Sequence, residues 1–127
     1  MKDKRDLALG WLEKARSDIY AAEIILSGEG PFDTACFHTQ QAIEKSLKSL
    51  LALWGNPIPR THNLDELQRL CVVIQPYQEL EKLDLTEVTD YAVQLRYDIE
   101  FWPDKEIAES SLALSKQVLE IVQKMLG

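Results

Sequence analysis

Apolar side chains recur every three or four residues along most of the chain, which is the spacing of one face of an α-helix. No segment of useful length alternates polar and apolar residues in the manner of a half-buried strand. Glycine and proline interrupt the helical pattern at Gly28, Gly30, Pro31, Gly55, Pro57, Pro59, Pro76 and Pro103. The pattern predicts an all-α fold, an up-and-down bundle of about five helices, with residues 1–127 as a single domain.

Two long helices are expected in the first half of the chain, over residues 6–26 and 32–54. Pro31 is expected at the first position of the second helix, where its missing N–H costs nothing. The short connection predicts that the two helices form an antiparallel hairpin. The apolar stripe of the first helix is Leu7, Trp11, Ala15, Ile19, Ala22 and Leu26, and that of the second is Cys36, Thr39, Ile43, Leu47, Leu50 and Trp54.

Capping residues mark the remaining helices. Asn63 is expected to cap a third helix, with Glu66 three residues later completing a capping box, and this helix ends before Pro76. A fourth segment starts near Tyr77 and can break where Asp84 and Glu87 form a second capping box. Asp104 is expected to cap the last helix. The apolar faces of these three segments are Leu64, Leu67, Leu70 and Cys71; Leu85, Val88, Ala92 and Leu95; and Ala108, Leu112, Ser115, Leu119, Val122 and Leu126.

The formal net charge is -7, and the acidic excess lies in the second half of the chain. Residues 1–54 carry 7 basic and 8 acidic side chains, whereas residues 55–127 carry 7 basic and 13 acidic ones. A protein that depends on phosphate contacts is usually basic, so general nucleic-acid binding is disfavoured unless a local basic pocket or a partner subunit reverses the field.

The sequence indicates a cytoplasmic protein without a membrane segment. No apolar run approaches the roughly 18 residues that span a bilayer. The start of the chain is charged and then amphipathic, unlike a signal peptide. Cys36 and Cys71 stand among apolar residues and are interpreted as reduced core residues. The three tryptophans, Trp11, Trp54 and Trp102, are interpreted as core or interface anchors.

The second helix carries an unusual number of hydrogen-bonding side chains, and a helical projection sorts them. With Ile43 at the centre of the buried face, Gln40 and Glu44 lie on one shoulder. Near the opposite pole lie His38, Gln41 and Lys45. This back face either meets water or binds a partner or ligand, and the residue pattern alone leaves both alternatives open.

Three segments resemble the HEPN domain family: "ACFHTQQAIEKSLKSLLALWG" at residues 35–55, "PRTHNLDELQRL" at 59–70 and "YAVQLRYD" at 91–98. The family's helix motif C-F-H-x-Q-Q-A-x-E-K-x-L-K starts here at Cys36. Its T-H-D/N-L turn falls at residues 61–64, its R-Y pair is Arg96 and Tyr97, and its early W-x-x-x-A-x-x-D starts at Trp11. The motifs occur in the family's order over nearly the whole chain.

The resemblance implies a helical bundle that often dimerises. Many bacterial and archaeal members are encoded beside a minimal nucleotidyltransferase (MNT) and form a paired module with it, often a toxin–antitoxin system. Toxic members cleave RNA with an arginine followed after four to six residues by a histidine, and two copies of this motif meet across the dimer. Other members have been proposed to bind nucleotides.

The ribonuclease motif is incomplete in this chain. A histidine is expected five to seven positions after Arg96, where the chain has Phe101, Trp102 and Pro103. Neither histidine of the chain follows an arginine at that spacing. Asp98 or Glu100 could act as a base, but 10 acidic and 3 basic residues between positions 79 and 109 make a poor phosphate site. Cleavage by the standard mechanism is therefore disfavoured, and if the chain does cleave RNA, Arg96 is the expected catalytic residue.

Six residues are candidates for binding a ligand or partner: His38, Gln41, Lys45, His62, Arg96 and Tyr97. Two of these assignments have structural alternatives. His62 could organise the turn before the third helix rather than contact a ligand together with Arg60, and Arg96 could pair with Asp90 or Glu100. The acidic residues near Arg96 could be read as a metal site, but Asp104 is needed as a cap, so neither a metal nor a cofactor is expected.

The preferred interpretation is a homodimeric binding component of a two-component module with an MNT-type nucleotidyltransferase, with a nucleotide as a further candidate ligand. Two alternatives stay open. One is a ribonuclease toxin with a degenerate active site, and the other is a nucleotide-binding module that acts alone.

Overall fold

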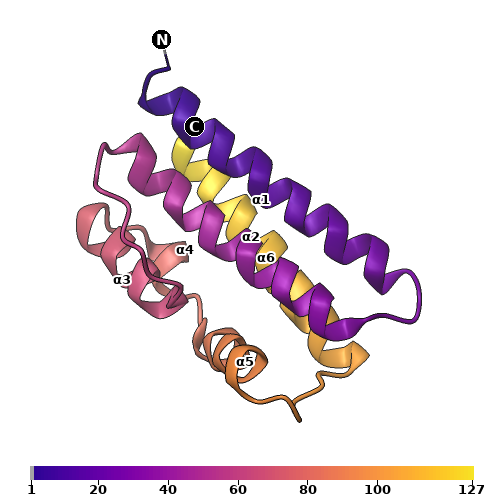
Figure 1. Ribbon diagram of the computed structural model, residues 1–127. Coiled ribbons are helices and arrows are strands. Elements are labelled where there is room, and N and C mark those ends of the chain that lie inside the picture. Colours follow the sequence, from indigo (N-terminus) through magenta and orange to yellow (C-terminus); the bar gives the residue numbers. More distant parts are fainter. Residues whose placement is uncertain (1) are drawn as a thin grey trace.

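The computed structural model describes residues 2–127 and is all-helical over that part of the chain (Figure 1). The helices are α1 (Lys4–Leu26), α2 (Phe32–Leu53), α3 (Leu64–Ile74), α4 (Gln78–Glu81), α5 (Thr86–Tyr97) and α6 (Lys105–Leu126). The all-α prediction is confirmed. There is one helix more than about five, because the fourth segment does break near Asp84 into the single turn of α4 and the longer α5.

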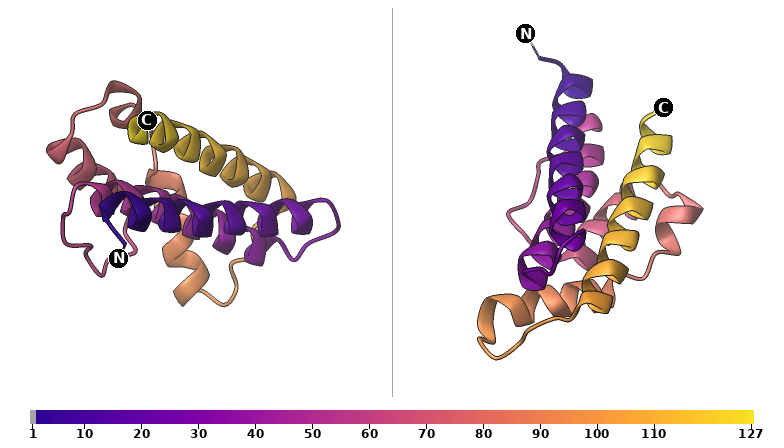
Figure 2. Two further views of the ribbon diagram at one scale, coloured as in Figure 1. Left: turned by 90° about the horizontal axis from the view of Figure 1, so that it is seen from above. Right: turned by 90° about the vertical axis from the view of Figure 1, so that its right-hand side faces the viewer.

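The three long helices lie side by side along their length, and α5 lies crosswise near one end of them (Figure 2). The chain reverses direction between α1 and α2, so the predicted antiparallel hairpin is confirmed (Figure 1). The two ends of the described chain meet, since the Arg5 guanidinium donates to the carbonyl oxygens of Leu126 and Gly127 at 3.0 and 3.1 Å. No helix within residues 2–127 is long and apolar enough to cross a membrane.

Small side chains form the contact between α1 and α2, which is the most extensive between any two helices here. In each helix they recur every seven residues, which is close to two helical turns and keeps them on one face. Small residues at such a contact let two helix axes approach closely. The rows are Ala8, Ala15 and Ala22 in α1 and Ala35, Ala42 and Ser49 in α2, all completely buried.

The predicted apolar stripe of α1 is wrong at its first position, Leu7, whereas Trp11 packs against the core. Leu7 is 49% exposed and Trp11 is half-buried, whereas Ala8 and Leu12 are buried. The expected stripe and the alanine row share Ala15 and Ala22, and they differ at the start of the helix, where Ala8 rather than Leu7 is buried. The buried face at the start of α1 is therefore displaced by one residue from the face that the expected stripe predicts.

The stripe of α2 is confirmed, because Cys36, Ile43, Leu47 and Leu50 are completely buried. It belongs to a core that also includes Leu12 of α1, Leu64 and Leu67 of α3, and Val118 and Val122 of α6. Helix α2 contacts α1, α3, α5 and α6, so it is the central helix.

Both cysteines are buried thiols, as expected. Burial raises the pKa of Cys36 to about 11, with a further contribution from the carboxylates of Asp33 and Asp104. Burial alone raises the pKa of Cys71 to about 12. Both side chains are thus protonated near neutral pH and behave as small apolar groups.

Two of the predicted helix caps are confirmed. The carboxylate of Asp104 accepts a hydrogen bond from the Ile107 N–H at 2.9 Å, and the Asn63 side chain accepts one from the Glu66 N–H at 3.0 Å. The capping box at Asn63 is wrong in its second half. The Glu66 carboxylate accepts from the Thr61 hydroxyl, and that hydroxyl in turn accepts the Asn63 N–H.

The other two helix starts differ from expectation. Pro31 is the N-cap residue of α2 and not its first helical residue. Asp84 accepts from the Thr86 N–H at 3.0 Å, which lowers the pKa of its carboxyl group, but Leu85 is the N-cap residue. The Glu87 carboxylate accepts from the Tyr91 hydroxyl instead of closing a second capping box.

The close contact of α1 with α2 predicts that larger side chains will not fit there. Ala15→Leu and Ala42→Leu should each lower the free energy of unfolding by about 1–3 kcal/mol, because added methylenes in a packed contact force backbone shifts. Urea denaturation followed by circular dichroism measures the change. Ala113→Leu, on the exposed face of α6, is the matched control and should have little effect. Equal midpoints for all three variants would contradict close packing of the hairpin.

Candidate functional site

A hollow of about 270 Å³ lies between the turn before α3 and the helix α5. It contains three of the six candidate residues, which come from two elements that are distant in the sequence. These are His62 of the turn and Arg96 and Tyr97 of the last turn of α5. The remaining lining residues are Thr61, Asn63, Thr89, Ala92 and Val93.

His62 is held in place from behind by Glu44, which lies on the predicted polar shoulder of α2. Its Nδ1 atom is 2.9 Å from Oε1 of Glu44, whose side chain is almost completely buried. A carboxylate can only accept a hydrogen bond, so the imidazole proton lies on Nδ1, and in the neutral ring Nε2 is the free acceptor. The imidazole is thus an oriented group, although 54% of the side chain is exposed.

Lys48 completes this buried arrangement. Its Nζ atom lies 3.0 Å from Oε2 of Glu44 and 5.9 Å from the centroid of the Trp11 ring. Each oxygen of the Glu44 carboxylate therefore has its own partner. A buried charge is tolerated when it is paired and hydrogen-bonded in this way.

Arg96 is exposed and forms no hydrogen bond or ion pair with any residue that the structure describes. Its expected alternative role as a structural partner of Asp90 or Glu100 is not seen. Asp98, another neighbour, accepts instead from the Glu100 N–H at 2.9 Å. The five N–H donors of the guanidinium are thus available to a ligand or a partner molecule.

Thr89 adds a polar group that the sequence did not single out. The residue is 9% exposed, and its hydroxyl oxygen is buried without a hydrogen-bond partner within residues 2–127. Buried polar groups are nearly always hydrogen-bonded. Gln40 of α2 has a similarly unpartnered amide nitrogen, and α2 contacts α5. A hydroxyl among apolar helix residues has no sequence signal, so Thr89 could only be found in the folded chain.

Two of the other candidate residues, His38 and Lys45, lie in a second cluster, on the contact between α2 and α1. Asp18 of α1 is buried, and its carboxylate binds Nδ1 of His38 at 2.8 Å and Nζ of Lys45 at 2.6 Å. The back face of α2 is therefore used within the molecule rather than left to water. Gln41 is half-buried, and its side chain forms no hydrogen bond in the described part of the chain. None of these residues lines the hollow beside α5.

The two clusters have the same design, in which a buried carboxylate joins one lysine and one histidine. Lys48, Glu44 and His62 form the first cluster, and Lys45, Asp18 and His38 form the second. All six positions belong to the sequence motifs that resemble the HEPN family. The motifs thus coincide with the polar bridges that join α2 to α1 and to the turn before α3.

Positions 101–103 contain no group for acid–base chemistry. The Phe101 ring stacks on that of Tyr91, with centroids 5.9 Å apart, Pro103 is buried, and Trp102 is exposed. The segment after Arg96 therefore does not complete the arginine–histidine motif. Among the described residues, no group of three or more His, Cys, Asp or Glu side chains could hold a metal ion.

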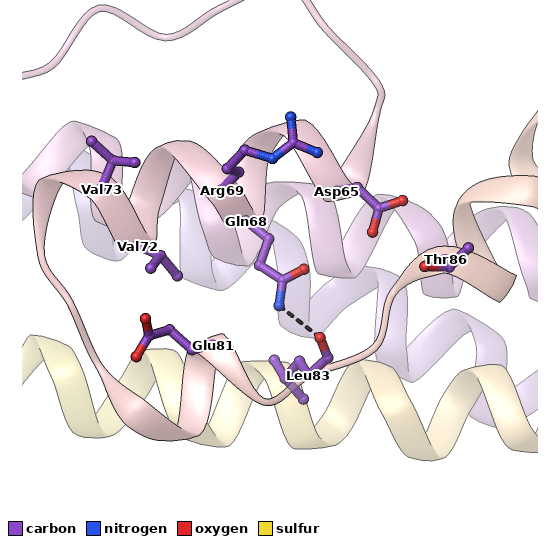
Figure 3. Close-up of a pocket in the computed structure, with 8 residues that line it drawn as sticks. All are labelled: Asp65, Gln68, Arg69, Val72, Val73, Glu81, Leu83 and Thr86. Atoms are coloured by element: carbon purple, nitrogen blue, oxygen red, sulfur yellow. Dashed lines mark hydrogen bonds between the residues drawn. The ribbon is translucent and has the colours of Figure 1, made fainter.

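A larger hollow, of about 520 Å³, lies between α3, α4 and the start of α5 (Figure 3). Gln68 donates to the carbonyl oxygens of Leu80 and Leu83, both at 2.8 Å, and so holds α4 and the following turn against α3. Charges of both signs line this hollow, from Asp65, Arg69 and Glu81 (Figure 3). Its lining residues include no histidine and none of the candidate residues. The hydrogen bonds that Gln68 donates here hold neighbouring segments of the fold together.

In a comparison with models of protein families, residues 8–125 match the family described as HEPN domain. No curated protein and no solved structure matches the chain. The matched span begins in α1 and ends in α6, so it includes both carboxylate clusters and the hollow beside α5.

Breaking the buried Glu44–Lys48 pair on one side should destabilise the fold more than removing both charges. Lys48→Met leaves the Glu44 carboxylate short of a partner, at an expected cost of about 3–5 kcal/mol in the free energy of unfolding. The double variant Glu44→Leu with Lys48→Met should recover most of that loss. Urea denaturation at neutral pH compares the variants.

Lys105→Met is the control, because it removes a lysine from the exposed pair with Glu109, and it should change stability by less than about 1 kcal/mol. Additive losses in the Glu44 and Lys48 variants would contradict a buried and mutually dependent pair.

Proposed function

We propose, on the premise that this chain belongs to the HEPN domain family, that it is the binding component of a two-component module with an MNT-type nucleotidyltransferase. In this proposal the protein is a cytoplasmic homodimer without a cofactor, and the module is of the toxin–antitoxin kind. A nucleotide is the small-molecule ligand that the proposal includes. The pairing with a nucleotidyltransferase rests on the family resemblance, and the surface of the fold supports a role in binding.

The observation that carries the proposal is a concentration of exposed apolar side chains between residues 93 and 102. Val93, Tyr97, Ile99 and Trp102 are 54%, 81%, 92% and 72% exposed. We call Ile99 and Trp102, the two of these that do not line the hollow, the apolar ridge. Soluble proteins seldom expose so many large apolar groups together without a binding role. The ridge therefore supports contact with a second protein chain, and we assign it to the homodimer.

The charges around the ridge favour a protein partner over a nucleic acid. Acidic side chains precede and follow Arg96 in α5 and in the segment up to α6, and they outnumber the basic ones. Such a surface repels a polyanion and attracts a basic protein surface. The apolar residues at positions 101–103 support the same conclusion, because they replace the imidazole that a cleaving member would use.

One observation keeps a rival function in consideration. His62 and Arg96 line the same hollow, so an imidazole and a guanidinium are present together although the motif spacing is lost. This favours either a ribonuclease with a degenerate site or a nucleotide-binding module that acts alone. The acidic surroundings make the first rival the weaker of the two.

The module proposal predicts a stable complex. A small nucleotidyltransferase, with Gly-Ser followed by paired aspartates, is expected to be encoded next to this chain. Co-expression with a tag on the nucleotidyltransferase alone should recover both chains together through size-exclusion chromatography. Separate elution of two folded proteins would count against the module.

The ridge assignment predicts which substitutions separate the homodimer. The wild-type protein should have twice the monomer mass by light scattering at tens of micromolar. Ile99→Asp combined with Trp102→Asp should give folded monomers, because charged side chains in an apolar contact lose their hydration. Val73→Asp, at an exposed valine of α3, is the matched control and should remain dimeric. A monomeric wild type excludes the homodimer, and a dimeric double variant places the contact elsewhere.

A further inference from the structure

We infer that the hollow between α3, α4 and the start of α5 is a docking groove for an amphipathic helix of another protein, one that carries lysine or arginine beside its apolar face (Figure 3). This inference rests on the proposed role in binding a protein partner, and it names the chemistry of the surface that the partner presents. The groove is separate from the ridge and from the hollow that contains His62.

Apolar side chains form the floor and part of the rim of the groove. Val72 and Leu83 lie in the gap between α3 and α4, where Leu83 is almost completely buried (Figure 3). Val73 also lines the groove and is 74% exposed, so the apolar surface continues beyond the hollow. A small molecule in the hollow would leave that surface in water, whereas one side of a helix covers both.

The size of the groove suits a short helix. Its volume is about 520 Å³, and the α3 side chains that line it extend from Asp65 to Val73, which is most of that helix. Helix α3 has 11 residues and is therefore about 16 Å long. Roughly three turns of a partner helix fit along it, with apolar side chains at positions i, i+3 or i+4, and i+7.

The groove is already formed in the free chain. Gln68 donates to the carbonyl oxygens of Leu80 and Leu83, both at 2.8 Å, and so holds α4 and the turn after it at a fixed distance from α3. A surface that is ordered before binding loses little conformational entropy when the partner arrives. The binding energy is then available for the apolar contact and the charges around it.

The charges around the groove specify the charge of the partner. The segment that builds it, residues 64–87, carries 6 acidic and 2 basic side chains. Among the lining residues Arg69 is basic, but its guanidinium points away from α4 (Figure 3). A helix with lysine or arginine beside its apolar face complements this surface, whereas an acidic helix or a polyanion is repelled.

Two carboxylates are available to pair with such a helix. Asp65 and Glu81 line the groove, and their side chains form no hydrogen bond or ion pair with any residue of the described chain. The other four acids of the segment already accept hydrogen bonds within the fold: Glu66 from the Thr61 hydroxyl, Glu79 from Lys124, Asp84 from the Thr86 N–H, and Glu87 from the Tyr91 hydroxyl.

Fluorescence anisotropy with three labelled synthetic peptides tests this inference on the isolated protein. Each peptide is about 14 residues long, or four helical turns. The first has leucines at helical spacing and lysines at the other positions, the second has glutamates in place of the lysines, and the third has the composition of the first in scrambled order. The lysine peptide should bind and the glutamate peptide should not. The scrambled peptide should bind about tenfold more weakly or worse, because it has no apolar face.

Substitutions with matched controls localise the binding. Glu81→Lys should weaken the lysine peptide by about tenfold or more, because like charges then meet in the groove. Val73→Ser should weaken it as well, by removing apolar contact. Glu13→Lys, at an exposed glutamate of α1, and Val93→Ser, at an exposed valine of α5, make the same changes elsewhere and should bind like the wild type. Circular dichroism checks that each variant is folded.

Amide chemical shifts measured by NMR locate the bound peptide, and the changes should fall in α3, α4 and residues 82–87. The inference is overturned by absent binding of the lysine peptide, by equal binding of the ordered and scrambled peptides, by equal effects of Glu81→Lys and Glu13→Lys, or by changes centred on residues 99–102. It is also overturned if the groove amides shift when the protein alone is concentrated, since the occupant is then a second copy. The nucleotidyltransferase is absent from this experiment, so failure of the module proposal remains a separate result.

Discussion

Asp18 and Glu44 are buried carboxylates, and each binds one lysine and one histidine. Moving such charges out of water costs more free energy than an incompletely hydrogen-bonded pair returns. Here both oxygens of each carboxylate have a partner, so that cost is largely offset. The two bridges also fix where α1 and the turn before α3 lie relative to α2. The Asp18 bridge holds α1 along α2, and the Glu44 bridge holds the turn before α3 against α2.

Helix α2 can carry these bridges because nearly every side of it meets another element. Its alanine row packs on α1, its leucine stripe packs on α3 and α6, and its polar shoulder meets the turn that carries His62. A helix enclosed in this way has little surface left for water. Its hydrogen-bonding side chains therefore take partners inside the molecule, where they also fix how the shorter helices are placed.

The candidate site depends on that placement. Arg96 ends α5, and His62 is fixed from behind by a carboxylate of the central helix, so the two reach one hollow from opposite walls. The histidine expected after Arg96 is replaced by apolar residues, yet an imidazole still lies beside the guanidinium. Motif spacing along one segment says little about a site whose groups come from different elements. The exposed side chains of Val93 and Tyr97 line this hollow, so it lies next to the surface that we assign to the homodimer.

The sequence by itself determined the all-α fold, the hairpin, the core stripe of α2 and the caps at Asn63 and Asp104. Periodicity, capping and helix breaking act over a few residues, so they can be read locally. It also marked His62, Arg96 and Tyr97, but as separate candidates. Only the tertiary structure decided that these three share a hollow with Thr89, that His38 and Lys45 bind Asp18, and that Ala8 rather than Leu7 is buried. The reason is physical: these outcomes depend on which helix faces meet, and close packing of small side chains sets that in three dimensions.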